Sequence, residues 1–365
     1  MSIINYLDNL QNNIPIKKNN TIEEIINFSN KNYERFFNYN NELLTKKYIF
    51  INEEINDLCD LIKLIEKYEY NSKFDYNINL KALHNIYPYL KKLNNMIGMK
   101  NLKTNIVDQI LYFIQDLHNN ENDYMHTCIY GPPGTGKTEI AKILGDIYSK
   151  LGILKNNIFK KASRADLIAG YLGQTALKTK KLIEECIGGV LFIDEAYALG
   201  NSEKRDMFSK ECIDTLCESL SEFKDKLMVI IAGYEKDLEE CFFSYNPGLK
   251  SRFSWSFKTD NYTSNDLKKI FIKKINESGW KFIDKDIKTS WFEENKEYFK
   301  YYGRDMETLF SKVKISHSKR VFCLDSKFKK VINFKDLEKG FEKFKENKKN
   351  NIYEFEKSIQ MSMYT

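Results

Sequence analysis

The sequence predicts an α/β fold in which a mostly parallel five-stranded sheet is covered by helices on both faces. Five short apolar segments, each bounded by turn or helix signals, lead to this prediction. They lie at residues 125–130, 158–162, 190–193, 227–232 and 255–257. Amphipathic helical patterns separate them, for example at 177–187. Short apolar strands that alternate with helices are typical of parallel sheets, because the crossover helices bury both faces.

Helical patterns are expected on both sides of this α/β domain, which we place at residues 91–258. Residues 1–90 have apolar side chains at helical spacing and few glycines, so they predict an α-helical N-terminal domain of unassigned role. No further strand is expected after residue 258. A small helical domain is predicted over residues 259–345, and a charged C-terminal helix or tail over 346–365. The helical patterns of the small domain lie at residues 267–275, 287–299, 305–315 and 334–344.

Composition narrows the class of protein. No stretch approaches the ~18–20 uncharged apolar residues of a membrane span, and the start of the chain lacks the basic region of a secretory signal. The seven cysteines are scattered and form no C-x-x-C pair. This pattern argues against a zinc ribbon or a disulfide framework and favours a reducing compartment. We therefore expect a soluble intracellular protein, in the cytoplasm or the nucleus, with no membrane partner.

The formal net charge of +6 is concentrated near the C-terminus. Residues 259–365 hold 24 basic and 17 acidic side chains, whereas the rest of the chain is close to neutral. A basic third of this kind can contact nucleic acid or an acidic partner. The alternative interpretation is a solvated helical surface, because the lysines alternate with acidic residues.

A glycine-rich segment after the first predicted strand indicates a phosphate-binding loop. It fits the pattern G-x-x-x-x-G-K-[ST] and reads Gly131-Pro132-Pro133-Gly134-Thr135-Gly136-Lys137-Thr138. In such loops the glycines let successive backbone N–H groups face phosphate oxygens, and the N-terminus of the following helix adds its dipole. We expect Lys137 to contact the β- and γ-phosphates of ATP and the Thr138 hydroxyl to ligate Mg²⁺.

Two carboxylates follow the third predicted strand directly. Asp194 is expected to coordinate Mg²⁺, directly or through water, and Glu195 to polarise the attacking water. An apolar run that ends in Asp-Glu is a weak signal when it stands alone. Its position downstream of the phosphate-binding loop makes it the predicted second half of an ATP site.

Together these elements resemble AAA+ ATPases, in particular the group that contains the red-type rubisco activase and the stage V sporulation protein K. The resemblance covers roughly residues 93 to 345 and leaves residues 1–90 outside. It implies a P-loop AAA+ module with a small helical lid, ATP hydrolysis, and assembly into a ring that we expect to be a hexamer. Beyond the two elements above, it rests on residues 170–175, 188–189, 196–197, 231–234 and 246–253.

The resemblance also implies roles for single residues. Arg252 stands where AAA+ proteins carry the arginine finger that reaches the γ-phosphate bound to a neighbouring subunit. Arg304 matches the sensor 2 position of the lid, and Ile97-Gly98 the segment that packs on the adenine. Tyr171 stands where ring ATPases present an aromatic side chain to the central pore. For Tyr171 the alternative is packing under its own loop.

One position departs from the AAA+ pattern. The fourth strand ends in Ala232-Gly233-Tyr234, where most AAA+ proteins have a polar residue that orients the attacking water. No residue is assigned to that role from the sequence.

The predicted function is that of a ring ATPase that remodels or unfolds a protein partner. The alternatives are a nucleic-acid remodeller or loader, favoured by the basic C-terminal third, and a nucleotide-gated scaffold with little turnover. The sequence does not identify the client.

Overall fold

The computed structural model describes residues 47–118, 123–171, 173–201, 203, 206–283 and 287–362, with side chains up to residue 348. The chain divides into two compact units. The described part of the smaller unit consists of residues 47–52 and 70–78. The larger unit begins with residues 53–69 and continues from residue 79.

The smaller unit contains two short strands that the helical pattern of residues 1–90 did not predict. β1 (Lys47–Ile49) and β2 (Phe74–Tyr76) pair in parallel. After β1, Ile51 donates its N–H to Asn77 Oδ1 at 2.8 Å, and Asn77 Nδ2 donates to the Ile51 carbonyl at 2.9 Å. Three-residue strands are too short to show an alternating pattern, which explains why the sequence does not reveal them. Residues 1–46 lie outside the described part of the chain.

Two amphipathic helices precede the α/β domain in the larger unit. α3 (Leu58–Lys67) begins at Asp57, whose side chain accepts hydrogen bonds from the backbone N–H groups of Cys59 and Asp60. α4 (Leu80–Asn94) begins at Asn79, which caps it in a similar way. Each buries one apolar face, and α4 packs against both α3 and α6 (Lys137–Lys150).

The five predicted strands form one parallel sheet, which confirms the predicted fold class. Its order is β4-β5-β6-β3-β7, and every adjacent pair is parallel. All residues of the three central strands are buried. The strands are β3 (Thr127–Tyr130), β4 (Phe159–Ala162), β5 (Val190–Ile193), β6 (Met228–Gly233) and β7 (Trp255–Lys258). Because they run in parallel, their carboxyl ends meet at one edge, where ligands bind in open α/β sheets.

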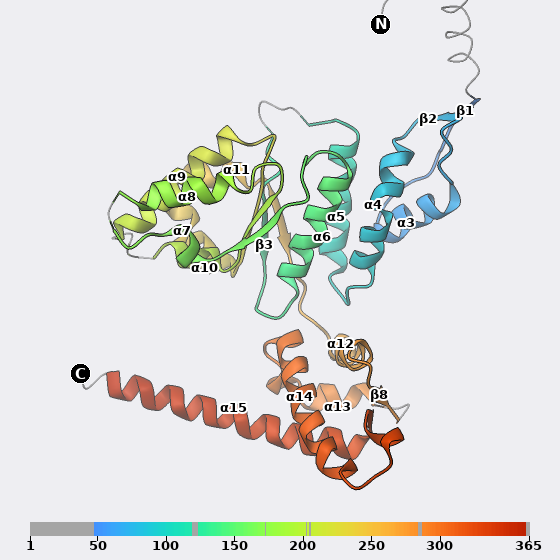
Figure 1. Cartoon of the computed structure of the whole chain (residues 1–365), viewed down its shortest axis with the longest axis vertical. Helices are drawn as coiled ribbons and strands as arrows, with labels where there is room; N and C mark the ends of the chain where they lie inside the picture. Colours follow the sequence, from blue (N-terminus) through green and yellow to red (C-terminus); the bar gives the residue numbers. More distant parts are fainter. Residues whose placement is uncertain are drawn as a thin grey trace, which may run out of the picture. The chain divides into compact units, whose positions relative to one another are not determined.

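Helices cover both faces of this sheet, as Figure 1 shows. α5 (Lys100–Ile114) and α6 lie on one side. α8 (Thr175–Glu184) and α9 (Met207–Glu222) lie on the other, where their apolar faces join the main core cluster with β5 and β6. The shorter helices between strands are α7 (Arg164–Leu167), η1 (Ala196–Leu199), α10 (Glu235–Cys241), η2 (Phe243–Tyr245) and α11 (Pro247–Arg252).

The region after β7, here called the lid, is built from four main helices, as expected. They are α12 (Ser264–Glu277), α13 (Thr289–Glu294), α14 (Tyr302–Val321) and α15 (Phe334–Ser362), with the short turns η3 (Lys296–Tyr298) and η4 (Ser326–Phe328). α15 continues through residue 345, where the sequence placed a domain boundary. Within the part of the chain that the structure describes, every helix is too short or too polar to cross a bilayer.

The expectation that no strand follows residue 258 is wrong. β8 (Lys281–Phe282) and β9 (Val331–Ile332) form a parallel pair of two residues each inside the lid. Such a pair is fixed by packing of the surrounding helices, since two residues carry no periodicity. Buried ion pairing holds the same region: Asp336 accepts hydrogen bonds from Arg320 Nε at 2.9 Å and lies 3.0 Å from His317 Nδ1.

Candidate functional site

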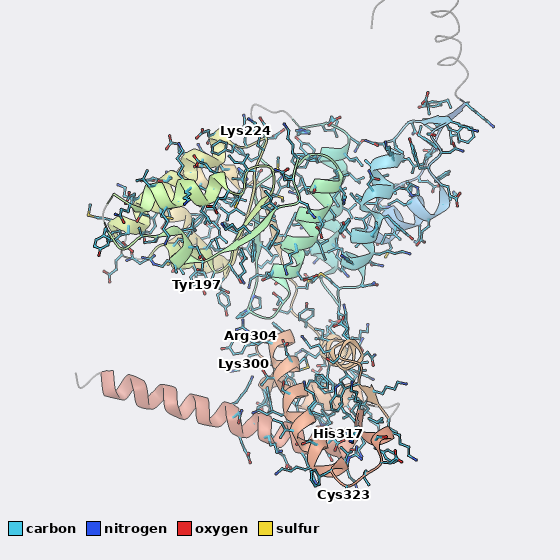
Figure 2. The ribbon with its side chains drawn as sticks, in the orientation of Figure 1. Tyr197, Lys224, Lys300, Arg304, His317 and Cys323 are labelled. Carbon is cyan, nitrogen blue, oxygen red and sulfur yellow. The ribbon has the colours of Figure 1, made fainter. Side chains whose placement is uncertain are left out.

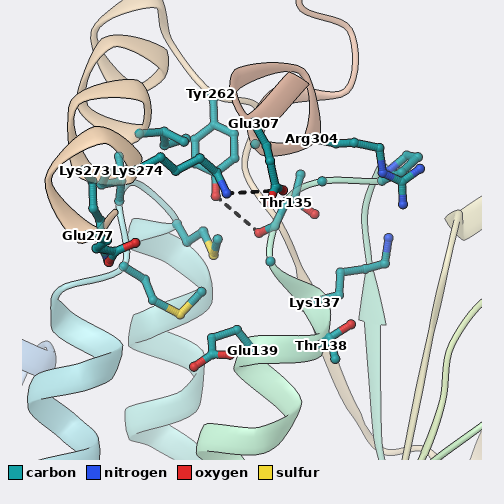
Figure 3. Close-up of a pocket in the computed structure, with 18 of the residues that line it drawn as sticks. Thr135, Lys137, Thr138, Glu139, Tyr262, Lys273, Lys274, Glu277, Arg304 and Glu307 are labelled. Atoms are coloured by element: carbon teal, nitrogen blue, oxygen red, sulfur yellow. Dashed lines mark hydrogen bonds and ion pairs between the residues drawn. The ribbon is translucent and has the colours of Figure 1, made fainter. Parts of the chain in front are cut away.

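A cavity of about 690 Å³ lies beside the N-terminus of α6 (Figure 3). Residues 133–139 of the glycine-rich segment and of α6 line it, together with Asp194 and Glu195 after β5. Ile97 contributes to the lining from the segment before α5, and residues of α12 and α14 contribute from the lid. The volume is in the range of small-molecule binding sites, about 300–1,000 Å³.

The backbone conformation of the glycine-rich segment would be strained for residues other than glycine. Gly134 and Gly136 have φ values of +80° and +86°, in the left-handed region that favours glycine. A Cβ atom at Gly134 would lie 2.1 Å from the Tyr301 carbonyl oxygen. Thr135 Oγ1 donates a hydrogen bond to the Pro132 carbonyl at 2.8 Å, which closes the loop from the inside. A turn of this kind at a helix N-terminus can present successive backbone N–H groups as a cradle for an anion.

Lys137 lies at the base of this cradle and is 6% exposed. Its ammonium donates hydrogen bonds to the carbonyl oxygens of Gly131 at 2.8 Å and Pro132 at 3.1 Å. The Nζ atom is also 4.0 Å from Glu195 Oε1. Burial lowers the pKa of Lys137, while the carboxylates of Glu195 and Asp194 act to raise it. The structure thus places a largely desolvated cation next to the two predicted carboxylates.

The two carboxylates differ in their surroundings. Asp194 Oδ2 accepts a hydrogen bond from Lys161 Nζ at 2.6 Å. Glu195 has φ +52° and ψ +48°, a left-handed conformation that is uncommon for a residue with a side chain. Its Oε2 atom is buried and has no hydrogen-bond partner among the described residues. A strained backbone with an unpaired carboxylate oxygen is typical of a functional site.

The lid contributes Arg304 and Tyr262 to the cavity. Arg304 lies in the first turn of α14, and the preceding Gly303 donates its N–H to the Gly134 carbonyl at 3.1 Å. Tyr262 donates its hydroxyl to the Thr135 carbonyl at 3.2 Å (Figure 3). These contacts join the lid directly to the glycine-rich loop.

Ile97 and Gly98 lie at the side of the cavity, next to Tyr262. Ile97 lines the cavity together with Met96 and Met99, which form an apolar side of the site. Gly98 has φ +69°, and a Cβ atom there would be 3.0 Å from the Tyr262 ring. An apolar wall beside a polar cradle suits a ligand with a flat ring and a charged tail.

Five of the predicted site residues do not line this cavity. Gly98, Gly131 and Pro132 are within two residues of lining residues in the chain, whereas Arg252 and Tyr171 belong to other segments. Arg252 does not line it; its Nε donates to Ser221 Oγ at 2.7 Å and its Nη1 to the Gly248 carbonyl at 2.6 Å. Tyr171 does not line it either and is 74% exposed. That exposure argues against the alternative in which Tyr171 packs under its own loop.

Lys161 and Tyr262 contact residues of the site but were not predicted from the sequence. Lys161 lies on β4, paired in register with Phe192 of β5, so its proximity to Asp194 depends on a long-range strand pairing. A lysine within a predicted buried strand is the one signal that could have drawn attention to it. For Tyr262, one of 23 tyrosines in the chain, the sequence offers no comparable signal.

The residues of the cavity fit a nucleotide with a divalent cation. The loop supplies backbone donors and the Lys137 ammonium for an anion, and Met96, Ile97 and Met99 supply apolar surface for a base. The Thr138 hydroxyl and the Asp194 carboxylate are oxygen ligands of the kind that Mg²⁺ prefers. The unpaired Oε2 of Glu195 provides an acceptor for a water molecule.

Comparison with known proteins gives matches over the same region. A sequence model of the ATPase family associated with various cellular activities (AAA) matches residues 127–257. The chain is 42% identical over 297 residues to a cfxQ-like protein, R730, of Acanthamoeba polyphaga mimivirus, a match that covers 80% of this chain and 73% of that protein. It is 35% identical over 204 residues to stage V sporulation protein K of Bacillus subtilis (strain 168), which covers 54% of this chain and 63% of that protein.

Among solved structures, the AAA domain of FIGL-1 in complex with ADP is similar in fold. The TM-score is 0.50 at 19% sequence identity, and the match covers 67% of this chain and 82% of that domain. At this identity the likeness concerns the arrangement of strands and helices alone.

Proposed function

Because the chain belongs to the AAA family of ATPases, we propose that its cavity binds ATP with Mg²⁺ and hydrolyses it to ADP and phosphate. The observation that carries this proposal is the approach of Glu195 to the phosphate-binding loop. Glu195 Oε1 lies 4.0 Å from Lys137 Nζ, and its other carboxylate oxygen is buried and unpaired. One cavity therefore contains both a cation that can bind phosphate, Lys137, and a carboxylate that can accept a proton from water, Glu195.

The glycine-rich loop and Lys137 bind the phosphates in this proposal. The backbone N–H groups of residues 134–138 surround them, and the Lys137 ammonium exchanges its two carbonyl partners for β- and γ-phosphate oxygens. Thr138 and Asp194 hold Mg²⁺, which supplies positive charge to the phosphate oxygens when bound. For Asp194 this requires the Lys161 ammonium, now 2.6 Å away, to share or yield the carboxylate.

Glu195 acts as the general base. Its carboxylate accepts a proton as the oxygen of a water molecule bonds to the γ-phosphorus, and the bond from phosphorus to the bridging β–γ oxygen breaks to release ADP. The left-handed backbone of Glu195 turns the chain sharply after β5, which keeps the carboxylate beside the loop. Arg304 contributes a second positive charge from the lid and connects the state of the nucleotide to the lid.

Hydrolysis in this proposal takes place in a ring of subunits, expected to be a hexamer. Arg252 supports this because it lies outside the cavity of its own chain, where an arginine finger for a neighbouring subunit belongs. An always-charged planar guanidinium suits the charge that develops on the transferred phosphoryl group.

The partner in this proposal is a protein that the ring remodels. Tyr171 supports this, because it is 74% exposed and a Cβ atom added at Gly170 or Gly173, on the same loop, would meet no atom within 4 Å. An exposed aromatic ring gains apolar contact with many different side chains, as a contact with an extended polypeptide requires.

We expect Glu195→Gln to bind ATP but to hydrolyse it at least ~100-fold more slowly, the usual scale for removal of a positioned base. Asp194→Asn is the matched variant on the adjacent carboxylate and is expected to weaken binding of Mg²⁺–ATP instead. Binding by a fluorescent ATP analogue and release of phosphate measure the two effects separately. Hydrolysis at the wild-type rate by Glu195→Gln would place the base elsewhere.

Tyr171→Ala is expected to keep ATP binding, assembly and basal hydrolysis, because Tyr171 does not line the cavity. It is expected to lose the stimulation of hydrolysis by a permanently unfolded polypeptide, whereas Tyr171→Phe retains most of it. Hydrolysis rates with and without the polypeptide test this. Full stimulation of Tyr171→Ala by polypeptide, or stimulation of the wild type by single-stranded DNA alone, would contradict a protein-remodelling role.

A further inference from the structure

The end of β6 lacks a polar side chain that could orient the attacking water of the proposed hydrolysis. A base removes the proton of the attacking water, but a second contact is needed to direct the oxygen lone pair at phosphorus. β6 ends at Gly233, which has no side chain to provide it. Ile231 of β6 pairs in register with Ile193, two residues before Glu195, so the end of β6 lies beside the catalytic carboxylate.

The ring of Tyr197 occupies the space next to Gly233. Tyr197 belongs to η1, the short turn that begins directly after Glu195 and that the hydrogen bond from Ala198 N–H to the Glu195 carbonyl closes at 2.9 Å. A Cβ atom at Gly233 would lie 2.9 Å from Tyr197 Cδ1, closer than a side chain tolerates without a shift of its neighbour. The absence of a side chain at Gly233 therefore leaves room for the Tyr197 ring. Figure 2 labels Tyr197 at the edge of the α/β domain.

Tyr197 follows Glu195 by two residues, and its ring lies at the end of β6 that the strand register places beside Glu195. Burial, and after it the hydrogen bonding and charge of Glu195, raise the pKa of Tyr197 well above its ordinary value. The phenol therefore stays protonated at physiological pH and is available as a donor. The phenol can thus hold the Glu195 carboxylate, whose Oε2 has no hydrogen-bond partner among the described residues and is the acceptor left for a water molecule.

We infer that Tyr197 takes the place of the missing polar residue at the end of β6 and, together with Glu195, orients the attacking water. Tyr197 does not line the cavity itself. It acts through the Glu195 carboxylate, and is thus a positioning residue. The inference rests on the proposed hydrolysis and assigns to it a group that the sequence could not identify.

The test compares Tyr197→Phe with Tyr234→Phe. Each change removes one hydroxyl and keeps the ring, and the two rings are neighbours with centroids 6.3 Å apart. Tyr197→Phe is expected to lower kcat about tenfold or more, the effect of losing one hydrogen bond of roughly 1.4 kcal/mol, with the Kd for ATP and the assembly unchanged. Tyr234→Phe is expected to keep kcat within about threefold of wild type, because Tyr234 is not assigned to the water.

A double variant shows whether Tyr197 acts on the same water as Glu195. Glu195→Gln combined with Tyr197→Phe is expected to be less than about threefold slower than Glu195→Gln alone, since residues that act as a unit are not additive. If the two residues acted independently, the fold-losses of kcat in the two single variants would multiply instead. The melting temperature of Tyr197→Phe checks that the ring still fills its site.

Three outcomes would overturn the inference. A wild-type kcat for Tyr197→Phe would show that the ring only fills space over Gly233. A loss of kcat in Tyr234→Phe but not in Tyr197→Phe would assign the water to Tyr234. If the loss of kcat in the double variant equals the product of the losses in the two single variants, Tyr197 does not act through Glu195. Failure of the proposed function is a separate result, because it shows as normal hydrolysis by Glu195→Gln, whatever Tyr197→Phe does.

Discussion

Lys137→Ala is expected to abolish measurable ATP binding. Lys137 is 6% exposed, and its ammonium makes two hydrogen bonds at the base of the loop, where it would meet the phosphates. Hydrogen bonds to charged groups contribute about 1.5–3 kcal/mol each, so loss of the contacts to two phosphates raises the Kd by roughly 100-fold or more. Titration with a fluorescent ATP analogue measures this loss, and any assembly that depends on nucleotide should be lost with it.

Lys142→Ala is the matched control for this variant. Lys142 lies on the same helix, α6, but its side chain is exposed, so its removal changes the net charge equally without touching the cavity. Lys142→Ala is expected to bind the analogue like the wild type. If Lys137→Ala also binds like the wild type, the glycine-rich segment is not the phosphate site.

Arg252→Ala is expected to leave ATP binding intact and to lower hydrolysis by ~10³-fold or more, the effect of removing an arginine finger. Binding is spared because Arg252 does not line the cavity of its own chain. Hydrolysis is lost because the guanidinium no longer reaches the γ-phosphate held by the next subunit. ATP binding, phosphate release and the oligomeric state of the variant test these effects separately.

Arg252 also makes contacts inside its own chain, so a structural effect must be separated from a catalytic one. Its hydrogen bond to Ser221 connects α11 to α9, its hydrogen bond to the Gly248 carbonyl lies within α11, and the loss of both would lower the melting temperature. Lys250→Ala is the control: Lys250 lies on the same helix, in an exposed ion pair with Glu239 at 2.9 Å. It is expected to keep full activity, since exposed ion pairs contribute little to stability.

Mixed assemblies of Arg252→Ala and Lys137→Ala subunits test the inter-subunit role. An Arg252→Ala subunit retains an intact nucleotide site, and a Lys137→Ala neighbour can supply the missing arginine to it. Part of the hydrolytic activity should therefore return on mixing, although each variant alone is inactive. If co-assembly is demonstrated and activity does not return, Arg252 does not act between subunits.

The sheet and the phosphate-binding loop were predictable because their signals are local. Apolar runs such as 190–193 and 227–232 mark buried strands by composition alone, and the structure has strands at Val190–Ile193 and Met228–Gly233. The glycine-rich loop is equally local, since the left-handed φ values at Gly134 and Gly136 require glycine.

The contacts that complete the site were not predictable, because they join distant parts of the chain. The approach of Lys161 to Asp194 depends on the pairing of β4 with β5, and the contact of Tyr262 with Thr135 spans 127 residues. The space that Gly233 leaves for the Tyr197 ring is likewise visible only once η1 packs against β6. In the sequence alone, Gly233 only marks a position where the polar residue of most AAA+ proteins is missing.

Phosphate release by the wild-type chain and by Glu195→Gln, each saturated with ATP, tests the central claim most directly. Measurements with Mg²⁺ and with EDTA, at equal occupancy by nucleotide, separate catalysis from binding. We expect Mg²⁺-dependent turnover by the wild type that exceeds that of Glu195→Gln by at least ~100-fold. Equal turnover by the two chains, or full occupancy of the wild type without any turnover, would contradict it.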